Sequence, residues 1–192
     1  MNIQVFSGDI CSKTAGLSPY NDIRVELFLA GCKMAREGHP CPGCFNSPLW
    51  DSKGGRSQDI SEVIQYIEKM TDNRYITIVG GEPLDQYPEV VELTKRLKEE
   101  KFHIVLFTHY TMSEVIQNYG QVLKYIDMLI DGKFDMEKRI FDTDLRPGIL
   151  HVVGSSNQKI WFNCSGEFVD VTDCDDLRPF YEGGGEHKRI NL

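Results

Sequence analysis

The chain has 192 residues, a hydrophobic fraction of 41% and a formal net charge of -8, which together predict one soluble domain with a core of its own. The negative charge argues against nucleic acid as a partner, because proteins that bind phosphate backbones usually carry a basic surface. No segment approaches the apolar length that spans a bilayer. The opening residues, MNIQVFSGDICSKTAG, show no basic stretch followed by an apolar core, so we expect no secretory signal and a cytoplasmic protein.

Strand and helix patterns alternate along the chain. Strands are predicted from short apolar runs at residues 23–30, 75–79, 104–108, 127–131, 149–153 and 159–163. One helix is predicted to start at the capping pattern Asp59-x-x-Glu62, and two more are predicted near Pro88 and over residues 112–125. Strands that alternate with helices indicate an α/β fold with a parallel sheet and right-handed crossovers.

Polar and glycine-rich residues follow four of these strands. In parallel sheets the ligand site lies at the carboxyl ends of the strands, so we expect these residues to meet in one crevice. They are a cysteine-containing loop, Gly80-Gly81-Glu82-Pro83, Thr108-His109 and Asp131-Gly132-Lys133. The alternation stops after residue 163, and three glycines stand among charges at 183–185, so we expect a domain over 1–163 and a mobile tail over 164–192.

Three cysteines stand close together in the loop after the first of these strands: Cys32, Cys41 and Cys44. In the cytosol such cysteines indicate metal binding or redox chemistry rather than disulfides. A cubane iron–sulfur cluster held by three thiolates keeps one iron free for another ligand. A structural zinc would need a fourth ligand, and His39 lies within the same loop. The cysteines alone leave both alternatives open.

Three cysteines followed by a Gly-Gly-Glu turn resemble the radical S-adenosylmethionine (SAM) superfamily. Three further stretches resemble the activating proteins of anaerobic (class III) ribonucleotide reductases: LFLAGC with CPGCFN, LIDGKF at 129–134, and GSSNQ at 154–158. This resemblance extends over residues 24–160 and implies an incomplete parallel (β/α) barrel of the radical SAM type.

The resemblance also implies the cofactors and their binding residues. A [4Fe-4S] cluster would be held by Cys32, Cys41 and Cys44, and its free iron would bind SAM. Thr108 and Asp131 are further candidates as oxygen ligands of a monovalent cation. The expected cofactor-binding residues are Gly43, Phe45, Gly80, Gly81, Glu82, Thr108, Asp131, Lys133, Ser155 and Asn157.

The implied activity is the formation of a 5'-deoxyadenosyl radical that installs a glycyl radical on an anaerobic ribonucleotide reductase. The electron would come from a flavodoxin or ferredoxin, and no side-chain acid or base is expected, because the cofactors carry the chemistry. Two alternatives stay open. One is a radical SAM enzyme with a small-molecule substrate, such as a 7-carboxy-7-deazaguanine synthase, and the other is a non-enzymatic zinc-binding module.

Two features depart from the family pattern. Cys32 and Cys41 enclose eight residues where three are usual, which adds about 1 kcal/mol or less of loop-closure cost and does not forbid a cluster. His109 stands where relatives commonly have glycine, and we expect it at the surface. Cys11, Cys164 and Cys174 are expected to be structural or incidental. The acidic residues Asp173, Asp175 and Asp176 are expected to be solvated, with docking to the reductase as the alternative.

Overall fold

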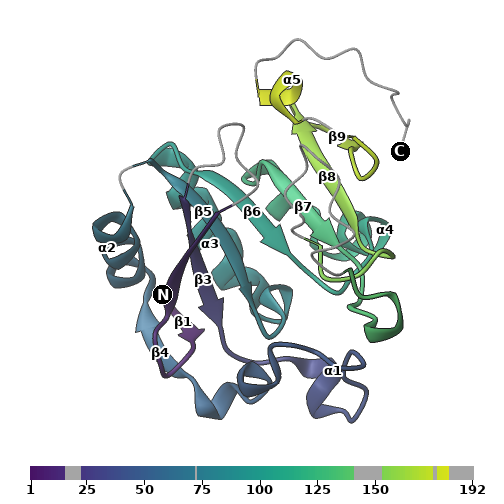
Figure 1. The fold of residues 1–192 in the computed structure, drawn as a ribbon. Helices are drawn as coiled ribbons and strands as arrows, with labels where there is room; N and C mark the ends of the chain where they lie inside the picture. Colours follow the sequence, from purple (N-terminus) through teal and green to yellow (C-terminus); the bar gives the residue numbers. More distant parts are fainter. Residues whose placement is uncertain (16–22, 72, 141–152, 175–176, 182–192) are drawn as a thin grey trace.

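A computed structural model describes residues 1–15, 23–71, 73–140, 153–174 and 177–181. Within these ranges nine strands form one sheet in the order β4-β1-β3-β5-β6-β7-β8-β9, with β2 paired to β3 (Figure 1). The strands are β1 Asn2–Val5, β2 Cys11–Ala15, β3 Ile23–Leu29, β4 Arg56–Asp59, β5 Tyr75–Gly80, β6 His103–Phe107, β7 Met128–Asp131, β8 Lys159–Cys164 and β9 Glu167–Asp170.

The centre of the sheet is parallel and its two sides are antiparallel. Strands β3, β5, β6 and β7 pair in parallel, which confirms the four strands predicted before residue 132. Strands β1 and β2 run antiparallel to β3, and β8 runs antiparallel to β7. The fold is therefore α/β with a mixed sheet: the predicted parallel arrangement holds for the four central strands, and the strands on either side of them are antiparallel. The strand predicted at 149–153 falls mostly outside the described residues.

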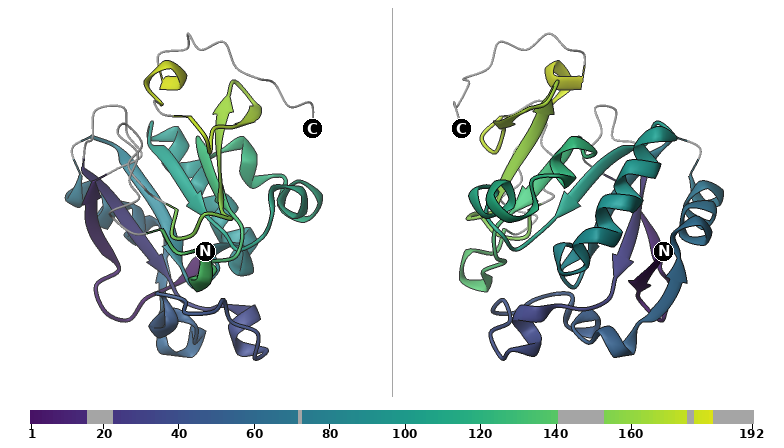
Figure 2. Two further views of the ribbon diagram at one scale, coloured as in Figure 1. Left: turned by 45° about the vertical axis from the view of Figure 1, so that its right-hand side comes forward. Right: turned by 180° about the vertical axis from the view of Figure 1, so that it is seen from behind.

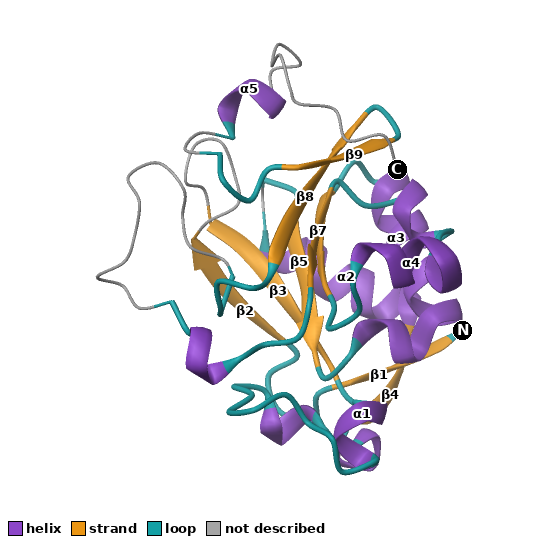
Figure 3. Ribbon diagram, turned by 90° about the vertical axis from the view of Figure 1, so that its right-hand side faces the viewer, coloured by secondary structure: helices purple, strands orange, loops and turns teal. Residues whose placement is uncertain are grey.

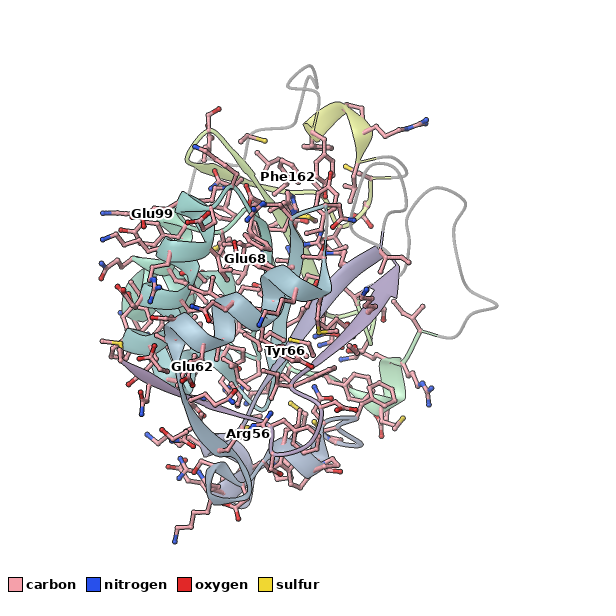
Figure 4. The ribbon with its side chains drawn as sticks, turned by 90° about the vertical axis from the view of Figure 1, so that its left-hand side faces the viewer. Arg56, Glu62, Tyr66, Glu68, Glu99 and Phe162 are labelled. Atoms are coloured by element: carbon pink, nitrogen blue, oxygen red, sulfur yellow. The ribbon has the colours of Figure 1, made fainter. Side chains whose placement is uncertain are left out.

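Three longer helices cover one face of this sheet (Figures 2 and 3). They are α2 Ile60–Met70, α3 Tyr87–Glu99 and α4 Met112–Tyr119, and α2 begins where the Asp59 carboxylate accepts a hydrogen bond from the Ser61 backbone N–H at 2.8 Å. Figure 4 shows Glu62, Tyr66 and Glu68 of α2, which are exposed, whereas its buried residues are Ile60, Val63, Ile64 and Ile67. This spacing of three and four residues keeps one apolar face of α2 against the sheet.

Short helices occupy the connections. They are α1 Lys33–Arg36 and α5 Arg178–Tyr181, with 3-10 turns η1 Ser47–Leu49, η2 Ser52–Gly54, η3 Pro83–Gln86, η4 Val122–Lys124 and η5 Met136–Lys138. In the described part of the chain no helix has the length and apolar character needed to cross a membrane.

Two groups of apolar side chains are buried. The larger lies between the helices and the sheet, and the smaller includes Val169, Val171 and Leu177 beyond β8. The β8–β9 hairpin crosses the boundary expected at residue 164, so Cys164 to Val171 are not a mobile tail but part of the sheet and its core. Residues 182–192 lie outside the described part of the chain.

Candidate functional site

A cavity of about 370 Å³ opens at the carboxyl ends of the parallel strands, where the sequence predicted a crevice. Its volume lies within the range of small-molecule pockets, about 300–1,000 Å³. The lining residues come from the cysteine loop, from the ends of β3, β5 and β6, and from the loops around η5 and before β8. They are Glu26, Phe28, Cys32, Met34, Cys41, Cys44, Phe45, Asn46, Trp50, Val79, Gly80, Gly81, Glu82, Pro83, Phe107, Thr108, His109, Gly132, Phe134, Gly154 and Gln158.

All three loop cysteines line this cavity. Cys32 immediately precedes α1, and its backbone N–H donates to the Trp50 carbonyl at 3.0 Å. The residues that lengthen the Cys32–Cys41 spacing include α1, and Cys44 then turns back to donate its N–H to the Cys41 carbonyl at 3.1 Å. The additional residues of the long loop therefore include a short helix between Cys32 and Cys41, and all three cysteines still line the same cavity.

The thiols lie in one electrostatic environment. Burial raises the pKa of the Cys41 thiol, and the nearby Cys44 and Cys32 raise it further, against a backbone hydrogen bond from Phe134. A bound cationic centre would remove this repulsion, because metal ligation favours the thiolate form. His39 is exposed and is not among the lining residues, so it does not join the cysteines as a fourth ligand. No three His, Cys, Asp or Glu side chains within the described ranges are grouped to hold a single metal ion.

The Gly80-Gly81 turn fits tightly against the start of the cysteine loop. Gly80 has φ of +138°, and a Cβ on Gly81 would lie 2.1 Å from the Gly31 carbonyl oxygen. The Gly81 N–H donates to Leu29 at 3.0 Å, and the Asn46 side-chain amide donates to the Gly80 carbonyl at 2.9 Å. Glycine is thus required at both positions for the turn to approach the loop.

Glu82 follows this turn and is 1% exposed. Its carboxylate accepts hydrogen bonds from the Leu84 N–H at 2.9 Å and from the Thr108 hydroxyl at 2.8 Å. It also accepts from the His109 backbone N–H at 2.8 Å and contacts the His109 ring nitrogen Nδ1 at 2.7 Å. Both oxygens are therefore held by the protein, and Glu82 connects the end of β5 to the end of β6.

His109 was wrongly expected at the surface. Its side chain is 12% exposed, and its ring contacts Glu82 on one side and packs at a tilt on the Tyr110 ring, with centroids 4.2 Å apart. Burial by itself would lower the pKa of His109. The hydrogen bonds and charges of Cys32 and Glu82 outweigh burial and raise the pKa to about 10.

The GSSNQ loop joins the cavity through its two ends, Gly154 and Gln158. The Gln158 side chain accepts from the Gly154 N–H at 2.9 Å and donates to the Gly132 carbonyl at 3.0 Å. Ser155 is fully buried, and its hydroxyl accepts from the Asp135 N–H at 3.1 Å. These contacts fix the segments before η5 and before β8 against each other.

Five predicted site residues do not line the cavity: Gly43, Asp131, Lys133, Ser155 and Asn157. The Asp131 carboxylate accepts from the Met112 N–H at the start of α4, and burial raises its pKa. Thr108 lines the cavity and its hydroxyl donates to Glu82, so each of the two oxygen groups predicted to bind a cation has a hydrogen-bond partner of its own. Lys133 is exposed, and the Asn157 amide donates to its carbonyl at 2.8 Å.

Five predicted cofactor-binding residues line the cavity besides the cysteines: Phe45, Gly80, Gly81, Glu82 and Thr108. His109, which was expected at the surface, lines it as well. Phe45 is 56% exposed and packs on Phe134 with ring centroids 4.7 Å apart. Sequence reasoning missed Asn46 and Gln158 as site residues, although both stand inside the motifs CPGCFN and GSSNQ. Their amide side chains could have identified them, because a side-chain amide can donate a hydrogen bond to a backbone carbonyl of a neighbouring loop.

Comparisons with known proteins show which family the chain resembles. A 4Fe-4S single cluster domain model matches residues 21–161. The anaerobic ribonucleoside-triphosphate reductase-activating protein of Escherichia coli K12 is 32% identical over 145 residues, 71% of this chain and 86% of that protein. The protein of the same name from Vibrio cholerae is 33% identical over 147 residues, with the same coverage.

A more distant relative from Methanocaldococcus jannaschii is 25% identical over 163 residues, 79% of this chain and 65% of its own length. Its provisional name is that of a glycyl-radical enzyme activating enzyme. The extent of these matches and the common cavity of the three cysteines place the chain in a family: it belongs to the anaerobic ribonucleoside-triphosphate reductase-activating proteins.

Proposed function

We propose that this chain is a radical SAM activating enzyme that installs a glycyl radical on an anaerobic ribonucleotide reductase. The observation that carries the proposal is that Cys32, Cys41 and Cys44 share one cavity with the Gly80-Gly81 turn. The family membership supports the activity, because the relatives are named for activating that reductase. We further propose that the mixed sheet is the incomplete barrel of this superfamily and that the enzyme works in the cytoplasm.

The residues of the cavity fit a [4Fe-4S] cluster. Three thiols face one cavity, and His39 is excluded from it, which suits a cluster with three protein ligands and one open iron. We propose Cys32, Cys41 and Cys44 as the cluster ligands, with SAM in the remaining space between Phe45 and the Gly80-Gly81 turn. When bound, the reduced cluster supplies the electron that cleaves SAM into methionine and the radical that oxidises the partner's glycine.

The chain's own residues position and enclose these groups. The Gly80 and Gly81 backbone comes close because neither residue has a side chain, and Asn46 holds the Gly80 carbonyl in place. Glu82 already accepts four hydrogen bonds, so we propose that it orders the turn rather than reaching the SAM amino group itself. Phe45, Phe134 and Trp50 provide aromatic surface around the space proposed for the adenosyl group.

Residues predicted at the cofactor but absent from the lining receive indirect roles in this proposal. Ser155 and Asn157 hold the GSSNQ loop, and Asp131 holds the start of α4. Lys133 acts electrostatically on Cys41, and Gly43 takes φ of +69° in the turn between Cys41 and Cys44. A flavodoxin or ferredoxin is proposed as the electron donor, because the cluster needs one electron for each turnover.

The test uses protein purified and reconstituted without oxygen, mixed with dithionite, SAM and an anaerobic ribonucleotide reductase. We expect 5'-deoxyadenosine and the doublet signal of a glycyl radical by electron paramagnetic resonance (EPR). Cys32→Ala, Cys41→Ala and Cys44→Ala should each abolish both products, whereas His39→Ala should retain them. Deoxyadenosine without any radical on the reductase would favour the small-molecule radical SAM enzyme instead.

A further inference from the structure

The helix α1 begins directly after Cys32 and lacks a cap of its own. Cys32 occupies the N-cap position, but its side chain makes no capping hydrogen bond, and the first turn of α1 contains no acidic residue. The first backbone N–H groups of a helix have no partner inside that helix and need another acceptor. A serine, threonine, aspartate or asparagine at the N-cap normally provides it. The Cys32 side chain is a thiol that lines the cavity, and it does not serve as this acceptor.

The acceptor comes from Asp85 in η3, 52 residues further along the chain. Its Oδ2 accepts a hydrogen bond from the Lys33 backbone N–H, the first residue of α1. Its other oxygen, Oδ1, accepts a longer hydrogen bond from the Tyr110 hydroxyl at 3.3 Å. The carboxylate is therefore held between α1 and the residues that follow β6.

Two contacts from the segment that follows β5 hold the residues on either side of Cys32. The Glu82 N–H donates to the Gly31 carbonyl at 2.7 Å, and Asp85 accepts from the Lys33 N–H. Cys32 lies between these two contacts and is 5% exposed. The backbone on both sides of the thiol is thus attached to one neighbouring segment.

The other two cysteines of the loop are held differently. Cys41 and Cys44 enclose only two residues, and the Cys44 N–H donates to the Cys41 carbonyl at 3.1 Å. Eight residues separate Cys32 from Cys41, and a longer spacer restricts the distance between its ends less than a short one does. The position of Cys32 relative to the other cysteines therefore depends on contacts made outside the loop.

We propose that Asp85 is a positioning residue for Cys32: it accepts the Lys33 N–H, supplies the cap that α1 lacks, and so keeps the Cys32 thiol at the cavity. This role compensates for the long spacing between the first two cysteines. The inference rests on the proposed function, because the thiol held in this way is one of the three proposed cluster ligands. Asp85 should then slow the loss of iron from a bound cluster.

Four substitutions separate the contacts of Asp85 from a general effect on stability. Asp85→Asn keeps a side-chain oxygen that can accept the Lys33 N–H, whereas Asp85→Ala removes the acceptor. Tyr110→Phe removes the other hydrogen bond of the carboxylate and leaves the α1 contact. Asp59→Ala is the matched control, because it removes a cap of the same kind, the 2.8 Å bond from the Ser61 N–H, at a helix outside the cavity.

The first measurement is the rate at which each cysteine of the metal-free protein reacts with iodoacetamide, followed by mass spectrometry. Cys11 in β2 is also 5% exposed, and its rate reports any general loss of stability. We expect Asp85→Ala to raise the Cys32 rate about fivefold, the usual effect of losing a helix cap. Asp85→Asn and Tyr110→Phe should stay close to the wild type at Cys32, and so should Asp59→Ala.

The second measurement is the rate of iron release to a chelator from the reconstituted protein. We expect release to be about fivefold faster in Asp85→Ala than in the wild type, with Asp85→Asn close to the wild type. Unchanged rates in Asp85→Ala would overturn the role of Asp85 and leave the proposed function intact. Equal Cys32 rates in Asp85→Ala and Asp59→Ala, or in Asp85→Ala and Asp85→Asn, would do the same. A wild-type protein that binds no cluster would overturn the proposed function and, with it, the ligand role of the thiol that Asp85 holds.

Discussion

The two faces of the central sheet differ in what covers them: helices pack on one face, and the cavity opens on the other. The face beneath α2, α3 and α4 is filled by aliphatic side chains such as Leu27, Ile78 and Leu106, each fully buried. Residues of opposite pleat on the same strands, such as Phe28 and Val79, line the cavity. One face contributes most of the apolar burial, and the other holds a space that apolar packing leaves unfilled.

Buried polar groups follow the same division. Arg24 is 1% exposed and shares the pleat of Phe28, and its guanidinium donates to the Thr77 hydroxyl at 3.1 Å and to the Ile76 carbonyl at 2.6 Å. Near the cavity, Glu82 is satisfied by four donors. A buried polar group is tolerated only when it is hydrogen-bonded, so this face depends on geometry more than the helix-covered face does.

The largest effect is expected where the cavity face leaves no space. Gly81→Ala would bring a Cβ to 2.1 Å from the Gly31 carbonyl oxygen, and Gly80→Ala would do the same at the Leu29 carbonyl while also requiring φ of +138°. We expect each to reduce the free energy of unfolding by about 3 kcal/mol or more. Urea unfolding of the metal-free protein, followed by circular dichroism, measures this loss.

The matched control for these glycines is Gly54→Ala, because the nearest atom to its new Cβ would be 3.9 Å away. We expect a change within about 0.5 kcal/mol for this variant. Equal losses at positions 54 and 81 would mean that the close approach of the turn to the cysteine loop is unimportant for stability.

Two adjacent residues of β5 compare the faces directly. Ile78 is fully buried beneath the helices, so Ile78→Ala should cost about 2–4 kcal/mol, because it leaves a new void in a close-packed core. Val79 lines a cavity that already exists, so Val79→Ala should cost about 1 kcal/mol or less. Urea unfolding of both variants checks the difference, and equal costs would contradict the division of the sheet into a packed face and a binding face.

The smallest effect concerns the pH dependence of Asp131. Burial raises its pKa above the ordinary 3.8, so the folded state binds its proton more tightly than the unfolded chain does. Its contribution to stability is therefore greatest below pH 3.8 and declines as the pH rises through the folded-state pKa. Relative to the wild type, Asp131→Asn should gain stability over this rise, by less than about 1 kcal/mol. Denaturant unfolding at several pH values tests this, and a gain toward acid pH would contradict it.

The helix-covered face was predictable from the sequence, because its apolar residues recur at the regular spacings of helices and strands. Residues 60, 63, 64 and 67 follow one helical face, and the four parallel strands are short apolar runs. The orientation of Asp131 was not predictable in this way, since every residue of β7 is buried and either pleat could face the cavity. The antiparallel direction of β8 likewise depends on the course of the preceding chain, which no local pattern specifies.

The cysteines and the glycine turn of the site were predictable from the sequence, whereas the position of His109 was not. The cysteines and the Gly80-Gly81 turn were recognisable because chemistry and backbone geometry restrict those positions to particular residue types. His109 carries no such signal, since a single histidine after a strand is equally compatible with a surface position, and its contact with Glu82 arises only when the ends of β5 and β6 meet in the fold.

The most direct test of the account is the metal and cluster content of the protein purified without oxygen, with EPR spectra of the reduced cluster before and after SAM is added. We expect iron and sulfide in the ratio of a [4Fe-4S] cluster, and a spectrum that changes when SAM binds. Cys32→Ala should lose the cluster, whereas Cys164→Ala, outside the cavity, should keep it. Zinc in place of iron, or a cluster retained without Cys32, would contradict the three-cysteine site on which the account depends.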